Sequence, residues 1–171
     1  MGKRKQAPDH AVVVQTYAEL RQLVQAFAEG HHELMTLVGS AGVGKSETVT
    51  RTLQAIRGAS GWTMLKGKHT PLDLYARLYQ SRSKPIVLDD LDGLLSDRNN
   101  TALLKCVCDT KPVKRVEWGS YHRAFNGRDG HLPKSFESIS RVCILANDFH
   151  TLNANISAVQ DRGVLILFQP D

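Results

Sequence analysis

Residues 34–56 read LMTLVGSAGVGKSETVTRTLQAI: an apolar run, a glycine-rich loop and then a helical pattern. Residues 39–46, GSAGVGKS, fit the pattern G-x-x-x-x-G-K-[ST] in full. The apolar run suits a buried strand, and Val49, Leu53 and Ile56 share one face of a helix. A glycine turn could fit this pattern by chance, but strand, loop and helix occur in the required order. The stretch therefore predicts a phosphate-binding loop.

The predicted loop has the chemistry to hold a nucleoside triphosphate. Glycine permits backbone angles that other residues avoid and lets amide N–H groups approach phosphate oxygens closely. The N-terminus of the following helix adds partial positive charge. We expect Lys45 to reach the β- and γ-phosphates and Ser46 to ligate Mg²⁺. The residues expected to contact ATP are Gly39, Ser40, Ala41, Gly42, Val43, Gly44, Lys45, Ser46 and Glu47.

Length and composition favour one domain. The chain has 171 residues, 42% of them hydrophobic, which is enough for one substantial core. No apolar stretch approaches the roughly 20 residues of a membrane-spanning helix, and residues 1–5 are followed by polar residues rather than by a signal-peptide core. We expect a cytoplasmic protein without a membrane partner. Residues 1–10 are expected to form a flexible basic start, and residues 11–171 a single core domain.

Short apolar runs alternate with helical patterns along the chain. Five runs are typical of strands: residues 34–38, 62–66, 86–88, 141–146 and 164–168. Helical patterns cover residues 12–29, 47–57 and 99–109, and Thr70-Pro71 opens another helix. This alternation predicts an α/β fold of three layers, αβα, with a five-stranded, mainly parallel sheet.

A second motif follows the predicted strand at residues 86–88. That strand ends in Asp89 and Asp90, and ligands in open α/β sheets collect at such strand ends. Asp89 is placed to hold Mg²⁺, directly or through water, and Asp90 to orient and polarise an attacking water molecule. The alternative is that these acids only cap the strand, but the phosphate-binding loop upstream argues for the catalytic interpretation.

Four motifs in order give residues 10–170 a resemblance to the AAA+ ATPases. They are the glycine loop, the acidic pair, residues 143–147 (CILAN) and residues 161–170 (DRGVLILFQP). The resemblance implies a P-loop NTPase fold, with Asn147 helping to position the hydrolytic water. It also implies that Arg162 acts as an arginine finger in the active site of a neighbouring subunit, within a ring or filament. Lys45, Asp90, Asn147 and Arg162 are thus the predicted catalytic residues.

The chain departs from the AAA+ pattern in two places. Asp90 stands where that family usually has glutamate, so the side chain is one methylene shorter. We expect either slow hydrolysis or a differently placed water molecule. The sequence ends at Asp171, where the family continues into a helical lid, and we expect a core domain without that lid.

The net charge of +5 is concentrated in one segment. Residues 111–141 hold seven basic against three acidic residues. Between residues 111 and 138 these charges are interleaved with Trp118, Tyr121 and Phe125, side chains that could stack on nucleic-acid bases. This segment is a candidate contact for a nucleic-acid or protein client. The alternative is an insertion whose aromatic rings pack on the domain and whose charges face water.

Three function classes remain on the sequence alone. The leading hypothesis is an oligomeric, ATP-driven remodelling protein that hydrolyses ATP with Mg²⁺. The second is a scaffold that binds ATP without hydrolysing it. The third is a P-loop kinase for a nucleotide or small molecule, which the Asn147 and Arg162 positions disfavour because a monomeric kinase needs no arginine from a second subunit.

Overall fold

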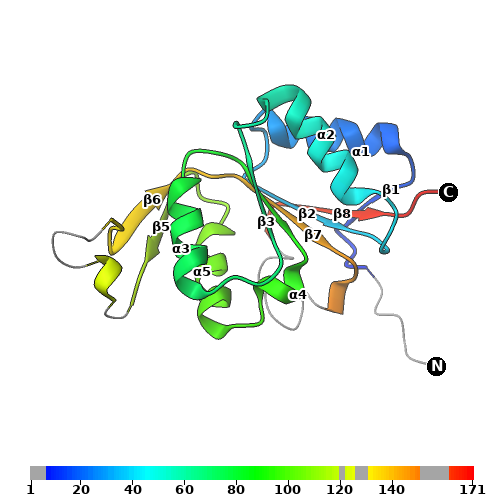
Figure 1. The fold of residues 1–171 in the computed structure, drawn as a ribbon. Coiled ribbons are helices and arrows are strands. Elements are labelled where there is room, and N and C mark those ends of the chain that lie inside the picture. The colour runs from blue at the N-terminus through cyan, green and yellow to red at the C-terminus, as the bar shows by residue number, and fades with distance from the viewer. Residues whose placement is uncertain (1–6, 120–121, 126–130, 151–161) are drawn as a thin grey trace.

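A six-stranded sheet forms the centre of the structure (Figure 1). Its strand order is β1-β8-β2-β7-β4-β3. The computed structural model describes residues 7–119, 122–125, 131–150 and 162–171. Every neighbouring pair in this sheet is parallel. The strands are β1 (Val12–Val14), β2 (Leu34–Val38), β3 (Thr63–Lys66), β4 (Ile86–Asp89), β7 (Val142–Ala146) and β8 (Val164–Phe168).

The sheet has one strand more than the five predicted. Residues 12–29 were expected to form one helix, but they form β1 and then α1 (Tyr17–Ala28). β-branched valines favour a strand, and β1 pairs with β8. Thr16 then caps α1: its side chain accepts from the backbone N–H of Glu19, and the Glu19 carboxylate accepts from the backbone N–H of Thr16. The helix prediction was therefore wrong at its first five residues.

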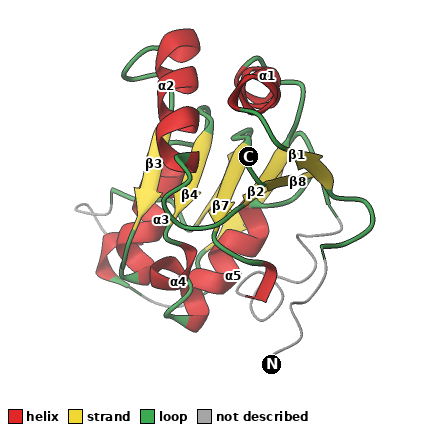
Figure 2. Cartoon of the chain, turned by 90° about the vertical axis from the view of Figure 1, so that its right-hand side faces the viewer, coloured by secondary structure: helices red, strands yellow, loops and turns green. Residues whose placement is uncertain are grey.

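Helices cover both faces of the sheet (Figure 2). On one face lie α1 and α2 (Lys45–Arg57); on the other lie α3 (Pro71–Gln80), α4 (Leu91–Leu94) and α5 (Arg98–Val107). Side chains alternate between the two cores along β2: Met35 and Leu37 pack with α1 and α2, whereas Leu34 and Val38 pack with the helices opposite. The predicted α/β class, with a parallel sheet between helical layers, is confirmed.

The basic segment, in which no strand was predicted, contains an antiparallel hairpin. β5 (Lys114–Glu117) pairs with β6 (Ser135–Ser138), and a short 3-10 helix, η1 (Arg123–Phe125), lies between them in sequence. The hairpin extends away from the main sheet beside α3 (Figure 1). Trp118 and Phe125 pack on Tyr75 of α3, with ring centroids 5.4 and 5.3 Å from the Tyr75 ring.

These contacts bear on the proposed client surface. Trp118 and Phe125 stack on each other at 5.2 Å, so these two rings pack on the domain, as the alternative interpretation of the segment holds. Tyr121, the third ring considered for base stacking, lies outside the described residues, as do Arg128 and Asp129, two charged residues of the same segment.

Residues 1–6, most of the expected flexible basic start, also lie outside the described residues. Among the described residues, no helix is long and apolar enough to cross a membrane.

Candidate functional site

The strand order brings the predicted loop and both other strand-end motifs together. β2 lies between β8 and β7, and β7 lies between β2 and β4. The chain leaves β2 for β3 at one edge of the sheet, and it later leaves β7 for β8 on the other side of β2. A ligand crevice is expected at such a switch point, outside the carboxyl ends of the strands. Residues 39–46 follow β2, Asn147 follows β7, and Asp89 ends β4.

The loop has the backbone geometry that its glycines permit. Gly42 and Gly44 have φ angles of 80° and 79°, a left-handed conformation that residues with a Cβ rarely adopt. Gly44 is the N-cap of α2, and among the described residues no side chain caps that helix. The first N–H groups of α2 therefore face the crevice without a side-chain acceptor, which is the usual arrangement for binding an anion.

Lys45 lies over the loop, nearly buried at 7% exposure. Its Nζ donates to the Gly39 carbonyl at 2.6 Å, to the Ser40 carbonyl at 2.8 Å and to Asn147 Oδ1 at 3.2 Å. Burial lowers the pKa of Lys45, and the Asp89 carboxylate opposes that shift. Because an ammonium group has three donors, Lys45 must exchange one of these bonds to bind a phosphate oxygen.

Ser46 and Asp89 meet at the floor of the crevice. Ser46 Oγ donates to Asp89 Oδ2 at 2.7 Å, although 43 residues separate the two in sequence. Asp89 Oδ1 accepts from the backbone N–H of Asp90 at 2.8 Å, which fixes the orientation of the carboxylate. The two residues predicted to hold Mg²⁺ are thus in direct contact.

These residues line a common cavity of about 480 Å³. Nine of the predicted site residues are on its wall: Ala41, Gly42, Gly44, Lys45, Ser46, Glu47, Asp89, Asp90 and Asn147. No group of three or more His, Cys, Asp or Glu side chains that could hold a metal ion occurs within the described ranges. A hydroxyl and one carboxylate nevertheless suit Mg²⁺, since that ion commonly takes one or two carboxylates and completes its shell with phosphate oxygens and water. The donor set fits a magnesium nucleotide.

The first turn of α2 also carries a surface ion pair. Glu47 Oε1 lies 2.5 Å from Arg51 Nη2, one helical turn away.

The glycine loop also contacts α1: Tyr17 Oη donates to the Val43 carbonyl at 3.0 Å. The loop is therefore held on one side by its own lysine and on the other by α1.

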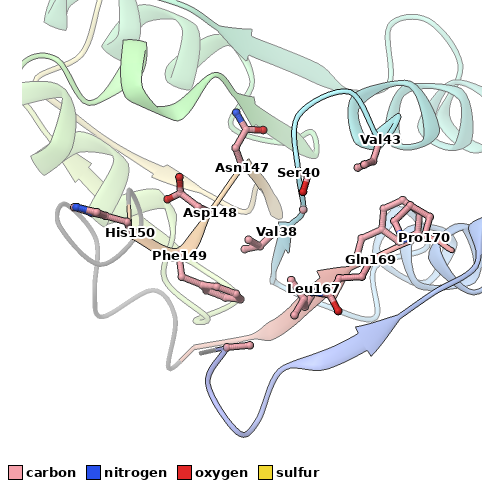
Figure 3. A pocket seen from close by; sticks show the side chains of 13 residues that line it. Val38, Ser40, Val43, Asn147, Asp148, Phe149, His150, Leu167, Gln169 and Pro170 are labelled. Atoms are coloured by element: carbon pink, nitrogen blue, oxygen red, sulfur yellow. The ribbon is translucent and has the colours of Figure 1, made fainter. Parts of the chain in front are cut away.

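A second cavity, of about 790 Å³, lies on the other side of Asn147. Figure 3 shows Phe149 and Leu167 facing each other in it, and Asn147 and Ser40, the latter from the glycine loop, also line it. This cavity is more apolar than the first, and it shares Asn147 and Asp148 with it. The sequence interpretation did not anticipate it.

Arg162 lies away from both cavities. It is exposed and lies two residues before the start of β8, at the amino end of that strand, whereas the cavities lie at the carboxyl ends. Its charge is one of the causes that lower the pKa of Cys108, against the larger effect of burial, which raises that pKa to about 12. Arg162 therefore does not belong to the site of its own chain.

Several wall residues were missed by the sequence interpretation. Lys66, Asp92 and Asp148 line the first cavity, yet none belongs to a quoted motif. Lys66 could have been found, because it ends a predicted strand and the carboxyl ends of parallel strands share one edge. Asp92 could not, since its position depends on the short helix α4.

The support for this candidate site comes from the arrangement of its residues in the structure. Comparison of the chain with models of protein families, with curated proteins and with solved structures finds no match.

Proposed function

We propose that this chain binds ATP with Mg²⁺ and hydrolyses it, as an AAA+-type protein with a P-loop NTPase fold. The observation that carries the proposal is the 2.7 Å bond between Ser46 Oγ and Asp89 Oδ2, beside the uncapped N-terminus of α2. Two motifs far apart in sequence thus supply a hydroxyl, a carboxylate, a lysine and free N–H groups to one cavity. This combination suits a triphosphate and its metal.

Each residue has a distinct part in the proposed reaction. Lys45 exchanges its bonds to the loop carbonyls for β- and γ-phosphate oxygens. Asp90, at the cavity wall, orients the attacking water, and Asn147 holds that water or the terminal phosphate. When bound, Mg²⁺ supplies neutralisation of the phosphate charge, and Ser46 and Asp89 hold it. The chain itself contributes mainly positioning and electrostatic stabilisation.

The direct test compares ATP binding with phosphate release in three proteins. Wild type should bind ATP and release phosphate. Lys45→Ala should weaken ATP binding by about tenfold or more, because a charge-assisted contact is lost. Asp90→Asn should keep binding but release phosphate about 10² to 10⁴ times more slowly.

The same measurements separate the alternatives. A wild type that assembles with ATP yet releases no phosphate would be the non-hydrolysing scaffold. Transfer of the terminal phosphate to an added acceptor would indicate a kinase. A wild type that binds no ATP in the presence of Mg²⁺ would overturn the proposal as a whole.

A further inference from the structure

Lys66 occupies a special position at the proposed site. It is the last residue of β3, and in the parallel pairing of β3 with β4 its register partner is Asp89. The two side chains therefore leave neighbouring strands at the same edge of the sheet. Lys66 lines the same cavity as Lys45 and Ser46.

The side chain of Lys66 is held only weakly. Its Nζ lies 3.8 Å from Asp89 Oδ2, too far for a hydrogen bond, and the side chain is 66% exposed. An exposed ion pair of this kind contributes little free energy, about 0 to 1 kcal/mol. The same oxygen already accepts the shorter bond from Ser46 Oγ. The ammonium group can therefore move at little cost.

The wall of the cavity carries more acidic than basic side chains, so a cation that can move would offset the added charge of a bound triphosphate. The wall carries two lysines, Lys45 and Lys66, against five acidic residues, Glu47, Asp89, Asp90, Asp92 and Asp148. A triphosphate adds more negative charge. Lys45 uses its donors on Gly39, Ser40 and Asn147. Among the described wall residues, Lys66 is the cation that is not bonded to the loop.

We propose that Lys66 is a phosphate-contacting residue: its ammonium group leaves Asp89 and binds an oxygen of the terminal phosphate of a nucleoside triphosphate. The proposal rests on the function proposed above. The terminal phosphate is the partner because Lys66 stands on the Asp89 side of the cavity, where Ser46 and Asp89 mark the metal position, away from the outer turn of α2. The flexible four-carbon stem of lysine suits such a movement.

The test compares a non-hydrolysable ATP analogue with ADP by calorimetric titration at fixed Mg²⁺ and ionic strength. Lys66→Gln should weaken binding of the analogue by about tenfold and leave ADP binding unchanged, since only the triphosphate offers the partner oxygen. Lys66→Arg keeps the charge and should keep the preference for the triphosphate. Lys68→Gln is the matched control: Lys68 is exposed, follows Lys66 by two residues and lies outside the cavity wall.

The outcomes distinguish a failure of the Lys66 assignment from a failure of the proposed nucleotide-binding function. If wild type binds neither nucleotide, the proposed function itself fails. If wild type binds both, but Lys66→Gln binds both as wild type does or loses both equally, the assignment of Lys66 fails and the nucleotide site stands. A loss in Lys68→Gln equal to that in Lys66→Gln would also overturn the assignment, because it would reflect general charge.

Discussion

At the scale of single residues, Asp90 combines a strained backbone with a position on the cavity wall. Its φ and ψ angles are 52° and 60°, and among the described residues it is the one non-glycine residue with positive φ. Asp and Asn tolerate this left-handed conformation better than other residues with a Cβ. Asp90 thus lines the cavity in a backbone conformation that few residue types adopt.

Substitutions at Asp90 should separate backbone strain from chemistry. Asp90→Asn should change the free energy of unfolding by less than about 0.5 kcal/mol, because Asn accepts the left-handed region. Asp90→Val should cost about 1 to 2 kcal/mol, since a β-branched residue fits there poorly. Urea denaturation measures both values. Both variants should lose phosphate release. Equal losses of stability would show that the missing carboxylate, and not the backbone, sets the cost.

Several residues of the candidate site could be identified from the sequence because the ends of the strands could be located there. Ser46, Asp89 and Asn147 each follow or end an apolar run, and parallel strands bring such ends to one edge. What could not be predicted was how the groups pair. The bond from Lys45 to Asn147 spans 102 residues and depends on β7 lying beside β2, a neighbour relation that no local pattern encodes.

At the scale of elements, Tyr75 connects the β5–β6 hairpin to α3. Its side chain is fully buried, and its ring lies against Trp118, Phe125 and Phe136. Its hydroxyl donates to the Pro133 carbonyl at 2.7 Å, just before β6. One side chain therefore contacts the hairpin through three rings and one hydrogen bond.

Removing that hydroxyl should loosen the hairpin without disturbing the ring contacts. Tyr75→Phe should lower the free energy of unfolding by about 1 kcal/mol. Tyr79→Phe is the control, since its ring also contacts Phe136 and no hydrogen bond among the described residues uses its hydroxyl. Chemical denaturation of the two variants gives the comparison. A Tyr79→Phe loss as large as that of Tyr75→Phe would count against a specific role of the bond to Pro133.

The same hydroxyl gives this prediction a pH signature. Burial raises the pKa of Tyr75 from 10.0 to about 12, so the folded chain keeps a proton that the unfolded chain releases. The resulting stability is fully present below pH 10.0 and is lost as the pH rises toward about 12. Tyr75→Phe should therefore lose less stability than wild type over that range.

Helices and strands could be predicted where the spacing of apolar residues and the positions of the glycines indicate the same structure. The strand, loop and helix at residues 34–57 agree in the sequence and in the structure, since their apolar spacing and glycines point the same way. The start of α1 could have been placed from Thr16 and Glu19, whose spacing is that of a capping box. The β5–β6 hairpin could not, because its stability depends on Tyr75 in a distant helix.

At the scale of the whole molecule, the position of Arg162 decides how the proposed site is completed. The residue precedes β8, and the cavity lies beyond the carboxyl ends of the strands. A strand of five residues spans about 17 Å at roughly 3.3 Å per residue. Arg162 is exposed at that opposite edge, so it cannot serve the cavity of its own chain. If it acts on a phosphate, it does so in a second copy.

A mixing experiment tests that arrangement. Arg162→Ala and Asp90→Asn should each release phosphate slowly, the arginine variant by a factor of about 10³ to 10⁵ below wild type if it stabilises the transition state. In a mixture, an Asp90→Asn subunit supplies an intact Arg162 to the intact Asp90 of its neighbour. Phosphate release should then exceed the sum of the two variants alone, with a maximum near equal proportions. Wild-type turnover by Arg162→Ala alone would remove the finger assignment, while leaving Lys45, Ser46 and Asp89 as a nucleotide site within one chain.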